Sequence, residues 1–211
     1  LKSLRNTENS ITRVHIMSAL MRDWDCGDKV FEVFTNPKEC IKEQRVVPFV
    51  YTGSDDQDAK LLSILEEMSQ SCHGGGDGQE EYGIGVKMAR HFFEAQRQSL
   101  GPHPTMSIFV SDDVHHGLGG NGDTLPQGSS HMPRGNDEMY ECEYAPLNSN
   151  GKHAWQGTNC LKEWDMLLKE GTLGIWCHVG KAAHPQQHQK FKAGLCRVAE
   201  SKPEYRGIIL A

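Results

Sequence analysis

The feature that most constrains the fold is a short apolar run that changes abruptly into a polar, glycine-rich turn. The run Met106–Val110 consists largely of strand-forming residues, and after Ser111 it is followed by acids, histidines and glycines over 112–120. An apolar run of this length, bounded by turn residues, is typical of a buried strand. In open α/β sheets, ligands bind at the carboxyl ends of such strands, which is where these polar side chains would lie. A polar surface loop explains the same residues equally well.

Further segments alternate between strand and helix patterns along the chain. Strands are predicted at 29–35, 45–52, 172–179 and 206–210, and helices at 59–68, 80–99, 160–169 and 181–193. Residues 11–21 carry an imperfect apolar stripe, which predicts a helix capped by Asn9 and Ser10. This order predicts an α/β fold, a single domain with a mostly parallel sheet flanked by helices.

The expected domain plan has a short first part and a long second part. Residues 1–45 are expected to form an N-terminal appendage of a helix and a strand, and 46–211 the α/β domain. Residues 117–151 are rich in glycine and lack a regular pattern, so they are expected to form an irregular insertion in that domain.

Composition excludes several functional classes. The 22 basic residues are scattered among 28 acids, and the net charge is −6, so no nucleic-acid partner is expected. No apolar run approaches the length of a membrane span, so no membrane partner is expected either. Seven cysteines at wide spacings, without a Cys-x-x-Cys pair, argue against a zinc ribbon and a compact disulfide framework. Reduced cysteines and a cytoplasmic location follow as the default, with one or two disulfides left open.

A second polar turn precedes the helix predicted at 59–68. Gly53 is followed closely by Asp55, Asp56 and Asp58. Carboxylates before and within the first turn of a helix favour the helix dipole and can cap exposed amides, which is a structural role. The functional alternative is that a strand, a glycine turn and paired acids form a site for a cation and for hydroxyl groups.

The polar turns would meet if the sheet is parallel. The turns after Thr52, Val110 and Val179 then lie at the same edge. The side chains that could converge there are those of Asp55, Asp56, Asp112, Asp113, His115, His116 and His178. Oxygen-rich clusters suit calcium or magnesium, whereas zinc prefers more histidine or thiolate. The 11 histidines of the chain also indicate metal or acid–base chemistry.

Two other histidine patterns are less specific. His184 and His188 have the i,i+4 spacing that places two imidazoles on one helix face, but an exposed polar turn is the commoner outcome around Pro185. Cys177 and His178 are neighbours, yet adjacent residues of a strand face opposite sides, which argues against a catalytic dyad.

Two stretches carry a family resemblance. Gly53–Ala59, followed by Leu61, Leu62 and Leu65, resembles the G-x-D-D-x-x-A stretch and apolar helix of the inosine–uridine-preferring nucleoside hydrolases. Asp113–Gly120 is similar to the histidine–glycine loop of that family. The resemblance covers about 45–190, and it implies an α/β fold that hydrolyses the N-glycosidic bond of ribonucleosides with one bound Ca²⁺ and an activated water.

The resemblance also implies residue roles. Asp55 would bind the ribose hydroxyls, and Asp56 would ligate Ca²⁺. Asp113 is a further candidate for binding the substrate. His115 or His116 would border the base, and the register between these two histidines stays open.

The pattern departs from the family before the glycine turn. The first aspartates of the family fall on Phe49 and Tyr51, so the expected general base is missing. A Ca²⁺-bound water would then give its proton to another group, for which Asp58 and His116 are the candidates.

Two alternatives remain. A non-catalytic α/β binding or interaction protein would keep the fold without a working site. Ser111–Asp113 and Trp176–Gly194 also resemble the paired-aspartate and helix segments of polysaccharide deacetylases, which implies a deacetylase-like hydrolase. The expected ligand is a small nucleoside or sugar, and a homo-oligomer is compatible with the sequence.

Overall fold

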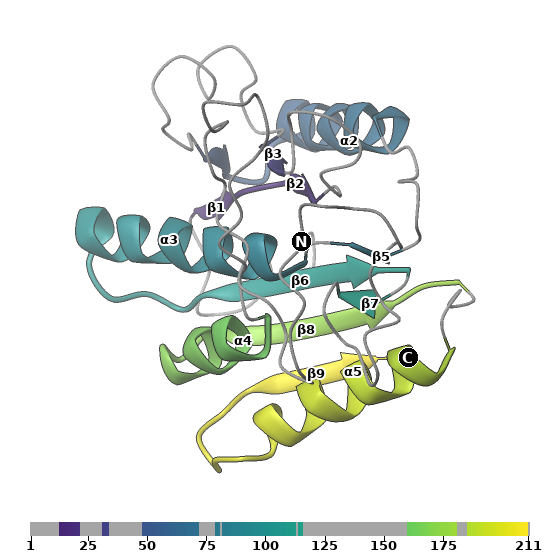
Figure 1. The fold of residues 1–211 in the computed structure, drawn as a ribbon. Helices are drawn as coiled ribbons and strands as arrows, with labels where there is room; N and C mark the ends of the chain where they lie inside the picture. Colours follow the sequence, from purple (N-terminus) through teal and green to yellow (C-terminus); the bar gives the residue numbers. More distant parts are fainter. Residues whose placement is uncertain are drawn as a thin grey trace, which may run out of the picture. The chain divides into compact units, whose positions relative to one another are not determined.

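The chain divides into two compact units, each with its own packed side chains. The structure, a computed structural model, describes residues 13–21, 31–33, 48–71, 79–80, 82–112, 114–115, 160–180 and 185–210. One unit comprises 1–20 and 31–73, and the other comprises 21–30 and 74–211. Figure 1 labels the elements of both units. The predicted insertion at 117–151 lies outside the described residues.

The described part of the first unit consists of two strand pairs and one helix. Strand β1 (Val14–Ile16) pairs antiparallel with β4 (Phe49–Tyr51), and β2 (Ala19–Met21) pairs with β3 (Phe31–Val33). Helix α2 (Asp55–Gln70) follows β4. The core consists of three buried side chains and five partly buried ones packed against them, namely Phe49, Tyr51, Ile64, Val14, Ile16, Leu20, Leu61 and Met68.

The helix predicted at 11–21 is wrong, because the described part of this segment forms β1 and β2. Val14 and Ile16 are β-branched and alternate with His15, a pattern that fits a strand with one side on a core. Their Cα partners in β4 are Tyr51 and Phe49, both buried. Packing between strands that lie far apart in the sequence therefore decides the structure of this segment.

Helix α2 confirms the helix predicted at 59–68 and begins earlier, at Asp55. Ser54 is the N-cap residue, and its hydroxyl accepts a hydrogen bond from the amide of Gln57. The early start places Asp55, Asp56 and Asp58 in the first turn of the helix. Carboxylates at these positions interact favourably with the positive end of the helix dipole.

The second unit has a parallel sheet covered by helices. Strands β6 (Met106–Ser111), β8 (Leu173–His178) and β9 (Gly207–Leu210) pair in the order β6-β8-β9, all parallel. The helices are α3 (Tyr82–Leu100), α4 (Cys160–Lys169) and α5 (Pro185–Ala199). A short parallel pair joins β5 (Gln79–Glu80) to β7 (Val114–His115). The strands and helices predicted between 80 and 112 and from 160 onward are thereby confirmed.

One side of this sheet packs against helices. Phe109 and Ser111 of β6 and Trp176 of β8 are buried, and Figure 1 shows α4 and α5 along the same side of the sheet. The rings of Trp176 and Phe109 are stacked with centroids 5.1 Å apart, and Phe191 of α5 meets Trp176 edge-on at 5.2 Å. The intervening β6 residues Met106, Ile108 and Val110 are all more than half exposed. The strand predicted at Met106–Val110 is therefore confirmed, but the expectation that it is buried holds for only one of its sides.

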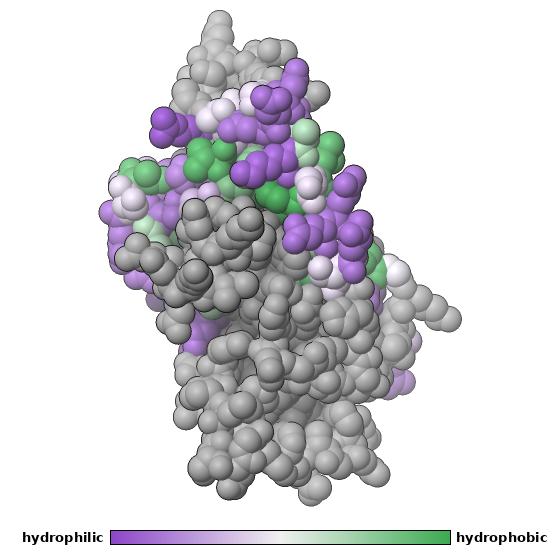
Figure 2. All heavy atoms as spheres, turned by 90° about the horizontal axis from the view of Figure 1, so that it is seen from above, coloured by the Kyte–Doolittle hydropathy of each residue, from purple (hydrophilic) through white to green (hydrophobic). Residues whose placement is uncertain are grey.

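The surface is mixed in polarity. Leu62 and Leu65 of α2 are exposed among charged neighbours. Figure 2 shows hydrophobic residues interspersed with strongly hydrophilic ones on the side seen from above. Single exposed apolar side chains of this kind are ordinary in folded proteins. No helix within the described residues is long and apolar enough to cross a membrane.

The architecture is therefore mixed α/β, with helices, a small parallel sheet and an antiparallel pair. The prediction that β4 continues the parallel sheet of β6 and β8 is wrong, since β4 pairs antiparallel with β1. A strand pattern in the sequence does not specify the partner strand, and antiparallel pairing lets β4 bury Phe49 and Tyr51 against nearby apolar residues.

Candidate functional site

The acids of the first polar turn lie at the start of α2. Asp55 and Asp56 are exposed, and Asp58 is partly buried. The hydroxyl of Tyr51 donates a hydrogen bond of 2.5 Å to Oδ1 of Asp58. This bond ties the end of β4 to the first turn of α2, so Asp58 has a structural role in addition to its proposed chemical one.

The side chain that organises this turn is Gln57, which sequence reasoning missed. Its Oε1 accepts hydrogen bonds from the amide of Thr52 at 2.6 Å, the hydroxyl of Thr52 at 2.8 Å and the amide of Gly53 at 3.0 Å. Its Nε2 donates to the carbonyl oxygen of Val50 at 3.0 Å. The sequence contains a signal for this role of Gln57, because Ser54 and Gln57 have the S-x-x-Q spacing of a capping box.

The second polar turn lies at the carboxyl edge of the sheet in the other unit. Ser111 of β6 is the register partner of His178 of β8, and the amide of Val179 donates to the carbonyl oxygen of Ser111 at 2.8 Å. Asp112 follows directly, is exposed, and accepts a hydrogen bond from the Tyr82 hydroxyl at 3.4 Å. The expectation that the turns after Val110 and Val179 share an edge is therefore confirmed.

The rest of this turn is described only in part. The backbone of His115 belongs to β7, where it pairs with Glu80, and β7 lies in contact with α5. Asp113 and His116 lie outside the described residues. The assignment of these three residues to a substrate site stays a prediction.

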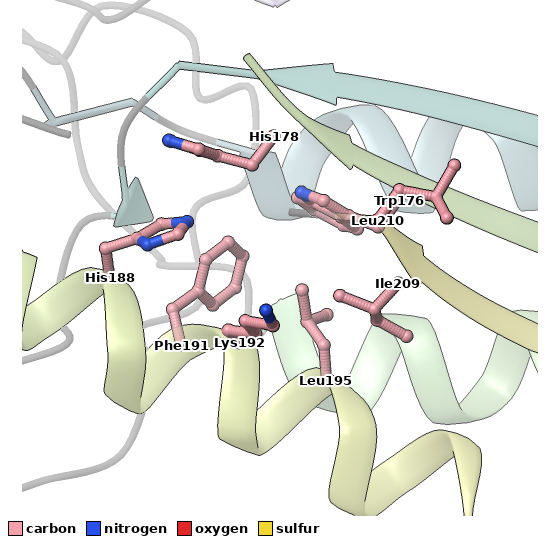
Figure 3. Close-up of a pocket in the computed structure, with 8 residues that line it drawn as sticks. All are labelled: Trp176, His178, His188, Phe191, Lys192, Leu195, Ile209 and Leu210. Carbon is pink, nitrogen blue, oxygen red and sulfur yellow. The ribbon is translucent and has the colours of Figure 1, made fainter. Parts of the chain in front are cut away.

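A small pocket lies beside His178, between the ends of β8 and β9 and one side of α5. Figure 3 shows its lining, which consists of Trp176, His178, His188, Phe191, Lys192, Leu195, Ile209 and Leu210. The ring centroids of His178 and His188 are 3.8 Å apart, with the ring planes inclined by 41°. Nδ1 of His178 is buried and has no hydrogen-bond partner. The carboxyl edge of β8 therefore carries two imidazoles in direct contact.

Sequence reasoning found the two histidines but not their pairing. The i,i+4 spacing suggests His184 as the partner of His188, but His184 lies outside the described residues. Instead, His188 meets a histidine from a strand, ten positions earlier in the chain. The sequence patterns above do not single out Lys192 as a site residue. The four-residue spacing of His188 and Lys192 nevertheless places both on one side of α5.

Metal-binding groups were sought among the described residues. Within those residues, no set of three or more His, Cys, Asp or Glu side chains is arranged to hold a metal ion. Among the described cysteines, Cys177 and Cys196 are free thiols. A calcium site that includes Asp56 therefore has to draw further ligands from beyond these side chains.

Comparisons with known proteins found no matching family model, no similar curated protein and no similar solved structure.

Proposed function

We propose that the chain is a hydrolase that binds a small sugar-bearing molecule at the carboxyl edge of β6 and β8 and cleaves the N-glycosidic bond of ribonucleosides. The observation that supports this proposal is the parallel pairing of β6 with β8, in which Ser111 is opposite His178. This pairing brings the start of the turn at 112–116 beside an imidazole. Acids and imidazoles at such an edge suit sugar hydroxyls and proton transfer.

In this proposal Asp113 and His115 bind the substrate, and His116 accepts the proton of the attacking water. The water oxygen bonds to the sugar carbon, and the electrons of the broken carbon–nitrogen bond pass to the departing base. His116 is preferred to Asp58 as the proton acceptor, because the Tyr51 hydroxyl already occupies one carboxylate oxygen of Asp58.

The roles that the resemblance gives to Asp55 and Asp56, which belong to the first unit, stay predictions. Both carboxylates are exposed at the start of α2, so they are open to ligands from solvent. Asp55 would bind ribose hydroxyls, and Asp56 would ligate a Ca²⁺ ion that lowers the pKa of its bound water.

A non-catalytic binding protein is the second candidate. It is favoured by the structural roles that the helix dipole and the Tyr51 bond assign to the acids of α2. The deacetylase-like alternative rests on its sequence resemblance alone. A cytoplasmic location, a possible homo-oligomer and a single-domain organisation, with 1–45 as an appendage to 46–211, also stay predictions.

The reaction is tested by incubating the protein with a panel of ribonucleosides in the presence of Ca²⁺ and measuring the released base. Base release that is lost in His116→Gln supports the hydrolase. Absence of release with every nucleoside, together with saturable nucleoside binding in calorimetry, supports the binding protein instead.

The metal is tested separately by calorimetric titration of Ca²⁺. The wild-type protein should give a binding heat that Asp56→Ala lacks, while Glu67→Ala, an exposed acid further along α2, should retain it. Equal heats for wild type and Asp56→Ala would remove the calcium assignment.

A further inference from the structure

We propose that the pocket lined by His178, His188 and Lys192 binds a small oxyanion, with the charge of a phosphate group. This inference goes beyond the proposed hydrolysis and does not depend on it. The pocket is formed by β8, β9 and α5, all within the second unit.

The polar lining of the pocket is made of nitrogen groups. His178, His188 and Lys192 supply it, and Figure 3 shows the rings of His178 from β8 and His188 from α5 beside each other, with Lys192 further along α5. The other lining residues are apolar, and none of the eight carries a carboxylate. A pocket with cationic and hydrogen-bonding nitrogens but no acid favours an anionic ligand.

The buried Nδ1 of His178 lacks a hydrogen-bond partner. A buried polar atom without a hydrogen bond costs about 1–3 kcal/mol, and Nδ1 of His178 is such an atom. An oxyanion oxygen would satisfy it by accepting a hydrogen bond from the ring N–H. A metal cation would be repelled by the ammonium of Lys192, and an apolar group would leave Nδ1 unsatisfied.

The charged side chains of α5 also favour an anionic ligand. The helix contains Lys190, Lys192 and Arg197, and no Asp or Glu between 185 and 199. This is unusual in a chain with 28 acids against 22 bases. His188 is the fourth residue of the helix, close to the positive end of the helix dipole. The charged side chains of the helix beside the pocket are therefore all positive, although the chain as a whole is acidic.

The dimensions suit one group of a ligand rather than a whole molecule. The enclosed space of the hollow is about 10 Å³, roughly the room for one water molecule. Sites for drug-sized ligands are far larger, at roughly 300–1,000 Å³. An anionic group would be held at the mouth, with the rest of the ligand in solvent or over the edge of the sheet. Free phosphate and a sugar phosphate both present this chemistry.

The test is an NMR titration of the imidazole signals with inorganic phosphate at about pH 6.5, where both protonation states of a histidine are accessible. Sodium chloride holds the ionic strength constant. The signals of His178 and His188 should shift and saturate. Lys192→Gln should weaken phosphate binding about tenfold, the effect of losing one charge-assisted hydrogen bond.

Lys190→Gln is the matched control, because Lys190 lies on the same helix, is exposed and does not line the pocket. It should bind phosphate as the wild type does. Circular dichroism checks that the variants are folded, and His188→Gln serves in place of Lys192→Gln if the latter is not.

Titrations with ribose 5-phosphate and with ribose distinguish the two classes of ligand. Tighter binding of ribose 5-phosphate than of phosphate, with no binding of ribose, would assign the pocket to a phosphorylated sugar, and the reverse order would assign it to the free anion. The proposal is overturned if neither phosphate compound gives saturable shifts, if Lys190→Gln weakens binding as much as Lys192→Gln, or if only zinc chloride gives saturable shifts.

Discussion

The indole nitrogen of Trp176 donates a hydrogen bond to the hydroxyl oxygen of Ser111, 2.9 Å away, although the two residues are 65 positions apart. Both side chains are buried on the side of the sheet that packs against helices. The bond joins β8 to the last residue of β6, directly before the polar turn. It therefore helps to hold in place the edge at which the proposed substrate site lies.

Ser111→Ala should lower the free energy of unfolding by about 1–3 kcal/mol, because it leaves a buried indole N–H without an acceptor. Urea unfolding followed by fluorescence measures the change. Ser107→Ala, in the same strand and only partly buried, is the control and should have a smaller effect. Equal losses in the two variants would mean that the bond to Trp176 contributes nothing specific.

Two glycines of the second unit should respond differently to a methyl group. A Cβ at Gly174 would lie 2.4 Å from the Trp164 ring, which is fully buried and has no room to move. Gly174→Ala should therefore cost about 1–3 kcal/mol through overpacking. A Cβ at Gly194 would meet the end of the Leu161 side chain at 2.8 Å, and this side chain is partly exposed and can rotate away.

Gly194→Ala also replaces a glycine inside α5 with the best helix former, a gain of up to about 1 kcal/mol. Its net effect should lie near zero. Thermal unfolding of the two variants gives the comparison, and a larger loss for Gly194→Ala than for Gly174→Ala would contradict the packing described here.

The elements that could be predicted from the sequence are those whose pattern is clear within their own length. Strand β6 is an apolar run bounded by turn residues, and α4 repeats apolar residues that end up buried at Trp164, Leu167 and Leu168. In both cases the pattern of residues that are neighbours in the sequence is sufficient to predict the element. No knowledge of partner strands was needed.

The failures come from interactions between distant residues. Residues 11–21 have a weak helical stripe, but Val14 and Ile16 gain their packing from Phe49 and Tyr51, which are more than thirty positions away. The same pairing removes β4 from the parallel sheet. A local pattern carries no information on which strand is the partner.

The candidate site shows the same limit. The sequence indicated His178 as the end of a strand and His188 as a helix residue, but not that their rings meet at 3.8 Å. Conversely, the acids at 55–58 stood out in the sequence because they are charged. The uncharged Gln57 makes most of the hydrogen bonds in that turn.

An ion-pair network between α3 and α4 provides a third prediction. Arg90 contacts Glu163 at 2.5 Å and Glu170 at 2.8 Å, and Arg97 also contacts Glu170 at 2.8 Å. The side chains of Arg90 and Glu163 are each only 13% exposed. Arg90→Gln should lower the free energy of unfolding by about 1–3 kcal/mol, because it leaves the partly buried carboxylate of Glu163 without its ion-pair partner. Arg97→Gln should cost less than about 1 kcal/mol, as for exposed pairs.

The stability contribution of Arg90 should not change with pH on the alkaline side of neutrality. Burial acts to lower the pKa of Arg90, but hydrogen bonds to Glu170 and Glu163 outweigh it and raise the pKa above its ordinary value. A raised pKa in the folded state stabilises the protein below that range, and the effect is lost only as the pH rises through it. Urea midpoints of wild type and Arg90→Gln should therefore differ equally at about pH 7 and about pH 9.

Replacing the glutamine of the capping turn should loosen the junction of β4 and α2. Gln57→Ala removes the shared acceptor of the Thr52 and Gly53 amides and the donor to Val50. Loss of a helix cap costs about 0.5–2 kcal/mol, and the partial exposure of this turn, where water can replace the lost bonds, puts the expected cost within that range. Hydrogen exchange should accelerate at the amides of Thr52 and Gly53 before it does elsewhere in α2. Gln70→Ala, exposed at the other end of the helix, is the control and should leave both amides protected. Unchanged exchange in Gln57→Ala would show that Ser54 and the helix dipole suffice to start the helix.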